Sequence, residues 1–452
     1  MKLMAVDVGT QSLKASIYNE NLQCLARERE RYQPRTYSGN CVEIEAGVFW
    51  ETLQNVAKRL PTEGIEGIAF STLCPSLVVM DREGEPLHPV ILHLDRRSQK
   101  QAEWILQVVG MDRFRTITGN PPIPGGMSVT SMLWLKENIP LPADALFGHV
   151  ETYLVKKLTG KFYIDPSNAS FTGLYETIAY GDWSTELTGA LGIPKSSLPE
   201  VLDSLSVAGR LQPEASKALG LPSGLPVILG ANDTTCAVAG AGIREPGKLF
   251  NTSGTVEILV LCTDTPLTSP NFLIRTHAYR NRWLLMRTLG AGGASIEWFR
   301  KNFYPDMSYQ HFYSVHIEEV LKRTDPPTLV FEPYLTGDRH RVEPLKASFS
   351  NITIDSSRDD FLYALCYYNI RFISSVLPEW EASCPLEKRI YHVGGGANEG
   401  YTSLKQRLMA EYKFVPIGET AERGAALLGF ETLGVSIDPK QIDPEGKKEG
   451  EL

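Results

Sequence analysis

Alternating apolar and polar positions near the start of the chain predict three consecutive strands. The apolar segment 3–8 ends at Gly9-Thr10, and segments 15–19 and 22–32 can return beside it as two more strands. A strand that ends in a tight glycine-containing turn and then reverses is typical of a β-hairpin. The sequence therefore predicts a β-meander whose first turn carries Gly9 and Thr10.

The same arrangement returns near the middle of the chain. The apolar run 225–229 leads into Gly230-Ala231-Asn232-Asp233, which is the pattern of a buried strand that delivers one carboxylate to a cleft. The following segment, 247–261, holds a second turn, Gly254-Thr255, between two β-like runs. Because both halves contain a strand, a Gly-Thr turn and a returning strand, we expect a duplicated α/β domain.

Helical and strand-like patterns alternate through the rest of the chain. Helical spacing of apolar residues predicts helices at 49–60, 359–380, 400–412 and 420–433, and residues 98–210 are rich in helix. Further strands are expected at 65–70, 77–80, 90–97, 272–288, 329–335 and 390–393. We expect one domain over 1–230, a second over 231–438 and a charged tail over 439–452. Without a Gly/Ser linker, the domains should pack closely.

The composition narrows the class of protein. A chain of 452 residues is long enough for two or three domains. The net charge of −8 argues against a nucleic-acid partner, which needs a basic surface. The seven scattered cysteines predict reduced thiols, and the absence of a signal-peptide pattern or long apolar span predicts a cytoplasmic protein without membrane contact. A homodimer is compatible with the sequence.

The two Gly-Thr turns suit the phosphates of a nucleotide. Glycine lets backbone N–H groups approach phosphate oxygens, and hydroxyl side chains add donors. Asp7, just before the first turn, could hold Mg²⁺ through water, because Mg²⁺ keeps much of its hydration shell. Each turn alone could equally be an ordinary β-turn, and Asp233 could be an ordinary carboxylate at a helix start.

A glycine run, Gly394-Gly395-Gly396-Ala397-Asn398, follows a strand and could let the backbone pass an adenosine, although a tight turn explains it as well. The Gly-x-Gly-x-x-Gly fingerprint of NAD-binding proteins and the Gly-x-x-x-x-Gly-Lys-Ser/Thr phosphate loop are both absent. The nucleotide expected from the Gly-Thr turns would therefore be held in another way.

The order of the motifs is more informative than any one of them. It runs Asp7-x-Gly9-Thr10, Gly230-x-x-Asp233, Ser253-Gly254-Thr255, Gly292-Gly293-Ala294-Ser295-Ile296-x-Trp298 and Gly394-Gly395-Gly396-Ala397-Asn398. In this order the sequence resembles the FGGY carbohydrate kinases, which have the actin/Hsp70/hexokinase fold of two ribonuclease-H-like domains around a nucleotide and sugar cleft. The resemblance covers residues 1–434.

This resemblance implies an ATP- and Mg²⁺-dependent kinase that phosphorylates a sugar hydroxyl. It implies that Asp233 is the general base and that Asp7 is the metal site. It further implies that ATP is bound by Gly9, Thr10, Gln11, Ser12, Lys14, Gly254, Thr255, Gly292, Gly293, Gly395, Gly396 and Asn398. An actin- or Hsp70-like ATP-binding switch without sugar transfer is the alternative from another class.

The sugar pocket departs from the family pattern. Glycerol kinases place an Arg-Glu pair where this chain has Cys74-Pro75, and Gly126 stands where an aromatic residue is common. Arg423 likewise replaces a small residue near the nucleotide wall. We therefore expect Cys74, Pro75, Asp95, Gly126 and Asp233 to contact the substrate. A ketose of pentose size or larger is expected, as in xylulose kinases, with a polyol or sugar acid as the alternative.

Overall fold

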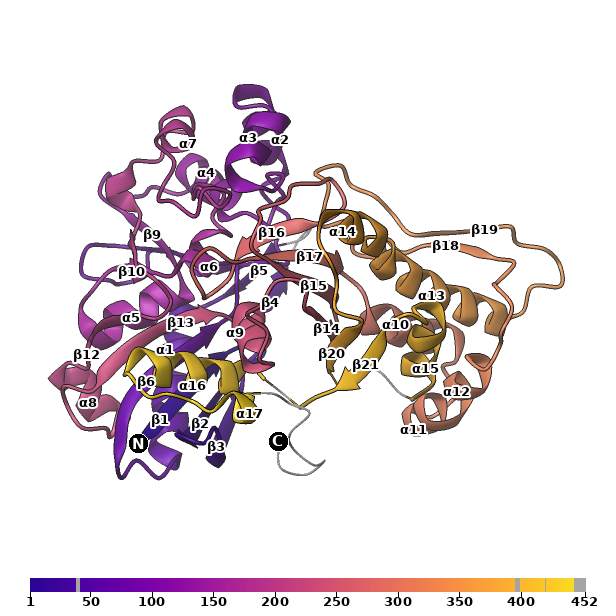
Figure 1. Cartoon of the computed structure of the whole chain (residues 1–452). Helices are drawn as coiled ribbons and strands as arrows, with labels where there is room; N and C mark the ends of the chain where they lie inside the picture. Colours follow the sequence, from indigo (N-terminus) through magenta and orange to yellow (C-terminus); the bar gives the residue numbers. More distant parts are fainter. Residues whose placement is uncertain (38–40, 395–398, 419, 443–452) are drawn as a thin grey trace.

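Two six-stranded sheets, one in each half of the chain, form the frame of the computed structural model (Figure 1). The structure describes residues 1–37, 41–394, 399–418 and 420–442. The first sheet has the order β12 (Val207–Arg210), β13 (Pro226–Asn232), β6 (Ile65–Thr72), β1 (Lys2–Val8), β2 (Ser12–Asn19) and β3 (Cys24–Arg31). The second has the order β16 (Leu273–Thr276), β17 (Trp283–Leu289), β15 (Glu257–Thr263), β14 (Leu249–Ser253), β20 (Arg389–Val393) and β21 (Lys413–Pro416).

The two sheets share one topology, so the predicted duplication is confirmed. In the first sheet, β1, β2 and β3 form an antiparallel meander, and β6 and β13 continue the sheet as parallel strands from β1. In the second, β14, β15 and β17 form the meander, and β20 and β21 continue it in parallel from β14. The hairpins β1–β2 and β14–β15 therefore occupy equivalent places in the two halves.

The alternation of side chains along β1 decides which way Asp7 points. Met4, Val6 and Val8 belong to the core beneath helix α1 (Ala46–Arg59). Leu3 and Ala5 belong to the core on the opposite face, beneath helix α16 (Ala421–Thr432). Because successive side chains of a strand point to opposite faces, Asp7 lies on the α16 face.

Helix α9 (Asp233–Gly240) lies between the two sheets. Cys236 and Ala239 pack into the core of the first sheet, whereas Val238 and Ala241 pack into the core of the second. Helix α16 crosses back from the second half to cover β1 and β6 and packs against α9 (Figure 1). The halves therefore share buried apolar contacts, as the lack of a flexible linker predicted.

A smaller, five-stranded sheet also belongs to the first half. Its order is β4 (Arg35–Tyr37), β5 (Cys41–Ile44), β8 (Val90–Leu92), β7 (Ser76–Met80) and β9 (Leu146–His149). The helices that follow are α2 (Gln99–Val108), α3 (Met111–Thr118), α4 (Ser128–Asn138), α5 (Val150–Thr159), α6 (Pro166–Ala169), α7 (Thr185–Ala190) and α8 (Pro213–Leu219). The strand predicted at 90–97 was too long: it ends at Leu92, where a turn begins with the Asp95 N–H donating to the Leu92 carbonyl (2.9 Å).

Helices α10 (Gly293–Phe303), α13 (Arg358–Ser374), α14 (Leu377–Ser383) and α15 (Glu399–Leu408) belong to the second half. The single helix predicted at 359–380 was wrong, because the chain forms α13 and α14 with a break between them. Pro378 lies in the first turn of α14, where its missing N–H costs nothing, whereas inside one continuous helix it would remove a hydrogen bond.

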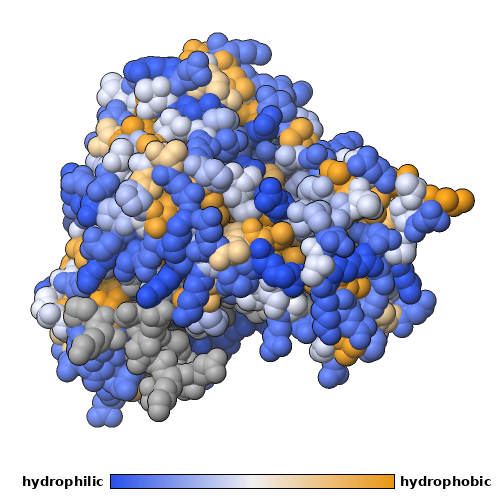
Figure 2. Space-filling view, turned by 45° about the vertical axis from the view of Figure 1, so that its right-hand side comes forward, coloured by the Kyte–Doolittle hydropathy of each residue, from blue (hydrophilic) through white to orange (hydrophobic). Residues whose placement is uncertain are grey.

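The face shown in Figure 2 is mainly hydrophilic, with apolar residues in small separate groups. Within the described ranges, no helix combines the length and the apolar character that crossing a membrane requires. All seven cysteines are free thiols, as predicted.

Candidate active site

Asp233 is placed by the end of strand β13. Gly230 has φ 72°, and the pairing of β13 with β6 shifts register between Ile228 and Ala231. A Cβ at Gly230 would lie 1.8 Å from the Phe70 carbonyl oxygen, so only glycine fits this irregularity. The strand then ends and delivers Asp233 to the first turn of α9.

The capping role that Asp233 could have had belongs to its neighbour. Asn232 is the N-cap of α9, and its Oδ1 accepts a hydrogen bond from the Thr235 N–H (3.0 Å). Asp233 Oδ1 accepts from the N–H (2.6 Å) and the Oγ1 (3.2 Å) of Thr234. Asn232 therefore caps the start of α9, and the cap does not use the second oxygen of the Asp233 carboxylate.

Asp7 supplies a second carboxylate near Asp233. Ser71 Oγ donates to Asp7 Oδ1 (2.7 Å), and Lys14 Nζ lies 3.7 Å from Asp7 Oδ2. Lys14 stands opposite Asp7 in the β1–β2 hairpin. Strand β1 thus carries Asp7, and its two neighbours β6 and β2 supply the side chains of Ser71 and Lys14 that contact the carboxylate.

The environment raises the pKa of Asp233 to about 7. The main cause is burial, which disfavours the charged carboxylate, and the negative charge of Asp7 adds to the shift. The hydrogen bonds from Thr234 oppose it. A carboxyl group with a pKa near neutrality can both accept and release a proton at physiological pH.

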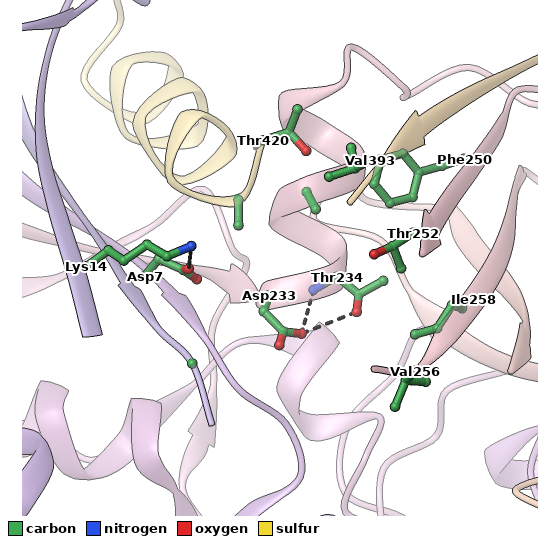
Figure 3. Close-up of a pocket in the computed structure, with 13 residues that line it drawn as sticks. Asp7, Lys14, Asp233, Thr234, Phe250, Thr252, Val256, Ile258, Val393 and Thr420 are labelled. Atoms are coloured by element: carbon green, nitrogen blue, oxygen red, sulfur yellow. Dashed lines mark hydrogen bonds and ion pairs between the residues drawn. The ribbon is translucent and has the colours of Figure 1, made fainter. Parts of the chain in front are cut away.

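Asp7 and Asp233 line a cavity of about 310 Å³ between the two halves, a size typical of small-molecule sites. In Figure 3, Asp7 and Lys14 lie on one side, Thr252, Val256 and Ile258 of the β14–β15 hairpin face them from the other, and Asp233 lies between. The start of α16 contributes Thr420 and Ala421. The cavity is therefore built by both halves.

The two predicted phosphate turns face this cavity from opposite sheets. Gly9, whose N–H donates to the Ser12 carbonyl (2.9 Å), and Lys14 line it directly. Thr10 and Gln11 form the rest of the first turn. Gly254 and Thr255 lie between Thr252 and Val256, which both line the cavity.

Residues 292–294 support the second turn. The Gly293 N–H donates to the Gly254 carbonyl (2.9 Å), and the Ala294 N–H donates to the Thr255 carbonyl (3.3 Å). A Cβ at Gly293 would lie 2.7 Å from the Gly254 oxygen, so a larger residue would push the turn away. The predicted adenosine residues Gly395, Gly396 and Asn398 lie outside the described residues.

Cys74 and Pro75 of the predicted sugar wall lie outside the cavity lining. Cys74 Sγ is 3.4 Å from His149 Nδ1, and the Cys74–Pro75 peptide is cis. Burial raises the pKa of the Cys74 thiol well above its usual value, and the charge of Asp233 raises it further. Among described residues, the cavity lining includes Asp233 but none of the other four predicted wall residues.

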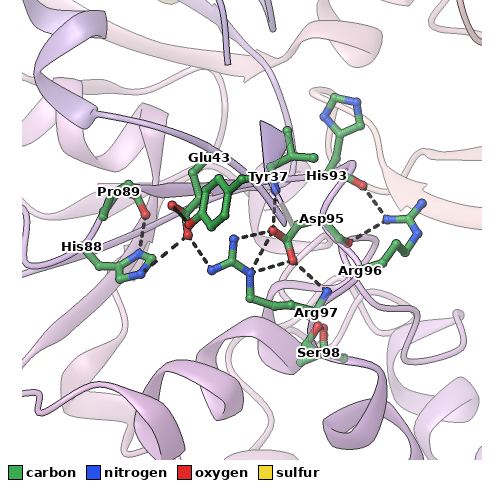
Figure 4. Close-up of polar contacts among 11 residues, drawn as sticks. Tyr37, Glu43, His88, Pro89, His93, Asp95, Arg96, Arg97 and Ser98 are labelled. Atoms are coloured by element: carbon green, nitrogen blue, oxygen red, sulfur yellow. Dashed lines mark hydrogen bonds and ion pairs between the residues drawn. The ribbon is translucent and has the colours of Figure 1, made fainter. Parts of the chain in front are cut away.

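Asp95 is fully buried, at 0% exposure, and its carboxylate is engaged within the protein. It accepts hydrogen bonds from the Val42 N–H (2.7 Å), the Arg97 N–H (2.9 Å) and the Arg97 guanidinium (Figure 4). Arg97 Nη1 also lies 2.5 Å from Glu43 Oε1. The loop containing Gly126 packs beside this network, where Arg96 Nη1 donates to the carbonyls of His93 and Pro124 (2.9 Å each).

Arg423 is directed away from the cavity. Its guanidinium donates to the backbone carbonyls of Gly240, Gln441 and Ile442. Burial lowers its pKa. Arg423 thus fastens the C-terminal helix α17 (Pro439–Ile442) to the end of α9, which gives a structural reason for a large basic residue at this position.

Comparison with known proteins places the chain among sugar kinases. Residues 2–240 match the N-terminal domain of the FGGY family of carbohydrate kinases. The chain belongs to the FGGY family. A curated relative, the xylulose kinase of Staphylococcus xylosus, is 26% identical over 407 residues, which is 87% of this chain and 83% of the relative. The glycerol kinase of Alkalilimnicola ehrlichii is 31% identical over 322 residues, 66% of this chain and 63% of the relative.

Solved structures of this FGGY family have the same fold. The xylulose kinase from Rhodospirillum rubrum superposes with a TM-score of 0.89 at 20% identity, covering 98% of this chain and 92% of that one. The actin-like fold of two domains predicted from the motif order is therefore confirmed, and kinases of the FGGY family use ATP as the phosphoryl donor.

A buried cation, Arg275, was not predicted from the sequence; its charge acts on the Cys74 thiol. Arg275 on β16 is 2% exposed, and its Nη1 donates to the carbonyls of Ser170 (3.4 Å) and Ile274 (3.1 Å). Its guanidinium lies 3.9 Å from the centre of the Phe171 ring. A charged residue directly after the apolar run Phe272-Leu273-Ile274 was the available signal.

Proposed function

We propose that this protein transfers the γ-phosphoryl group of ATP to a hydroxyl of a ketose of pentose size or larger, with Asp233 as the general base. The observation that carries the proposal is the half-buried Asp233 carboxylate, with its pKa raised to about 7, at a cavity lined by both hairpins. A proton acceptor and two opposed phosphate-binding turns are what phosphoryl transfer to a hydroxyl requires.

In this mechanism the protein forms no covalent bond with the sugar or the phosphate; it positions the reacting groups and stabilises their charge. The attacking hydroxyl gives its proton to the second oxygen of Asp233 as its oxygen bonds to the γ-phosphorus. The bond from that phosphorus to the β–γ bridging oxygen breaks and ADP leaves, while backbone N–H groups of the two turns and Lys14 hold the phosphates. The Thr234 hydrogen bonds fix the Asp233 carboxylate in one orientation. Because such transition states are loose, orientation and charge neutralisation matter more than the strength of the base.

The residues at the first hairpin fit Mg²⁺ bound together with ATP. In the described part of the chain, no three His, Cys, Asp or Glu side chains gather closely enough to hold a metal, so nucleotide oxygens and water would provide most ligands. Asp7 and Asp233 repel each other across the cavity, which a cation would relieve. Mg²⁺ neutralises charge on the β- and γ-phosphates, and Asp7 would hold it, through water.

The proposed substrate is supported by the likeness to xylulose kinases, one of which matches over 87% of this chain. Cys74, Pro75 and Gly126 lie outside the cavity lining and add no polar side chain to it. A site gains selectivity from hydrogen bonds to substrate hydroxyls. A ketose of pentose size or larger has more hydroxyls than glycerol for such contacts. We propose that the reaction takes place in the cytoplasm, where ATP is available.

A sugar acid is a second candidate substrate, favoured by Arg275. Burial lowers the pKa of this guanidinium to about 9, and its Nε has no hydrogen-bond partner. Its guanidinium contacts the Phe171 ring and the carbonyls of Ser170 and Ile274. The charges of Arg275 and Asp233 both act on the Cys74 thiol, so a substrate that binds at Asp233 and extends toward Cys74 would bring a carboxylate toward Arg275.

A substrate screen with an Arg275→Met variant separates the two candidates. ATP turnover would be measured with pentuloses, hexuloses, alditols, glycerol and aldonic acids. We expect ketoses to be the best substrates of the parent protein and the variant to keep ketose activity. If an aldonic acid is the better substrate, the variant should lose about 10- to 100-fold in kcat/KM for it. Glycerol reacting faster than every ketose and every acid would contradict both assignments.

The rate should depend on pH through Asp233. Because a base acts only when deprotonated, kcat/KM should fall as the pH drops through the pKa of Asp233, about 7. Removing the Asp7 charge in Asp7→Asn lowers that pKa, so the acid limb should move to lower pH. Rate profiles of kcat/KM for the sugar, from pH 5 to 9 or about that range, would test this. An acid limb near the ordinary carboxyl value, with no shift in the variant, would contradict it.

A further inference from the structure

A buried ion pair lies at the base of the second hairpin, outside the cavity lining. Lys405 Nζ on α15 is 2.5 Å from Glu257 Oε1, and both side chains are 1% exposed. Glu257 is the first residue of β15, directly after the turn. Burying two charges has a desolvation cost that is recovered only with good geometry and further hydrogen bonds.

Lys405 contacts both strands of this hairpin. Besides Glu257 on β15, its ammonium donates to Asn251 Oδ1 (2.9 Å) and to Ser253 Oγ on β14. Ser253 and Glu257 face each other as the last residue pair before the turn. All three donors of the ammonium group are therefore used, and they hold the two strands together immediately below Gly254 and Thr255.

Neighbouring side chains hold the pair in place. Tyr401, one helical turn before Lys405, donates from its hydroxyl to Glu257 Oε2 (3.0 Å). His392 Nδ1 lies 2.9 Å from Asn251 Oδ1. Burial lowers the pKa of Lys405, whereas the charge of Glu257 opposes that shift. The charges thus compensate each other within one connected polar network.

The turn above this network is held from its other side by the start of α10. The Gly293 and Ala294 N–H groups donate to the carbonyls of Gly254 and Thr255. A Cβ at Gly292 would lie 2.8 Å from the Glu257 Cβ, so the α10 start and Glu257 are in direct contact. The turn therefore has little freedom to change its distance from the cavity.

We propose that Glu257 and Lys405 are positioning residues that hold the second hairpin in the shape that binds the phosphates of ATP. This inference rests on the proposed function, because it assumes that phosphates bind between the hairpins. Thr252 on β14 and Ile258 on β15 line the cavity from the two strands that Lys405 contacts. Stability alone could be supplied by apolar side chains of similar size, but these would not fix the spacing of the strands through directed hydrogen bonds.

The test compares the binding of ATP and adenosine to a Lys405→Met variant by titration calorimetry. We expect ATP affinity to fall about 10- to 100-fold, while adenosine affinity and the KM for the sugar stay unchanged. A general loss of protein stability would weaken the binding of both ligands, so a loss confined to ATP indicates that the phosphate contacts have changed. Because Lys405→Met leaves Glu257 buried without its partner, the double variant Glu257→Gln/Lys405→Met, which removes both charges, should show the same selectivity if the single variant fails to fold.

Glu151→Gln is the matched control. Glu151 is also 1% exposed, but it lies in the first half, where its Oε2 accepts from the Asp165 N–H (3.0 Å). The control should change the melting temperature without separating ATP from adenosine. Equal losses for both ligands in the Lys405 variants, or no loss for either, would overturn the inference. A parent protein that binds ATP but phosphorylates no sugar would contradict only the proposed function.

Discussion

Replacing Asp233 by asparagine should lower kcat for sugar phosphorylation by about 10²- to 10⁴-fold. The amide is nearly the same size as the carboxylate and can still accept the hydrogen bonds from Thr234, but it cannot take the proton of the attacking hydroxyl. The hairpins that would hold the phosphates are unchanged. Calorimetry should therefore give the same affinity for ADP in the variant and the parent.

Thr234→Val is the control for this variant. It removes the 3.2 Å hydrogen bond from the Thr234 hydroxyl and keeps both the carboxylate and the 2.6 Å bond from the Thr234 N–H. Since that hydroxyl bond lowers the pKa of Asp233, its loss should move the acid limb of the rate to higher pH. If Asp233→Asn retains activity close to that of the parent, the proton goes to another group.

The second large effect is expected from Asp7→Asn. This variant keeps an oxygen that can accept from Ser71 Oγ but removes the negative charge that would attract a hydrated cation. Residues that act on a metal through an intervening ligand contribute about 10- to 100-fold to affinity or activity. The Mg²⁺ concentration for half-maximal rate should rise accordingly, as measured by titration at saturating ATP and sugar.

Ser71→Ala separates the charge of Asp7 from its orientation. It removes the 2.7 Å hydrogen bond to Asp7 Oδ1 and leaves the carboxylate in place. We expect a smaller loss than in Asp7→Asn and little change in the Mg²⁺ requirement. An unchanged Mg²⁺ dependence in Asp7→Asn would exclude this carboxylate as the metal site.

The features that could be predicted from the sequence are local ones. The β1–β2 and β14–β15 hairpins are contiguous in the chain, so alternation and a Gly-Thr turn were sufficient to find them. Asp233 could be singled out because it follows an apolar run that ends in glycine, which is the pattern of a buried strand leading to one carboxylate. The break between α13 and α14 was not predicted, although Pro378 was a local signal against one continuous helix.

The features that were missed depend on residues brought together by the fold. The five-stranded sheet combines β4 and β5 with β9, which follows only after four helices. Lys405 and Glu257 come from a helix and a strand far apart in the chain, and no spacing rule links them. Asp95 was expected at the sugar, but the sequence could not show that Arg97 and the Val42 N–H occupy its carboxylate.

The central claim is that ATP turnover in this protein is coupled to phosphorylation of a sugar, which an ATP-binding switch of the actin or Hsp70 type would not do. Phosphorus NMR of the protein with ATP, Mg²⁺ and a ketose follows both products at once. We predict a sugar phosphomonoester signal that grows together with ADP, and almost no ADP when the sugar is omitted. ADP and inorganic phosphate forming at the same rate with and without every sugar and sugar acid tested would contradict the account.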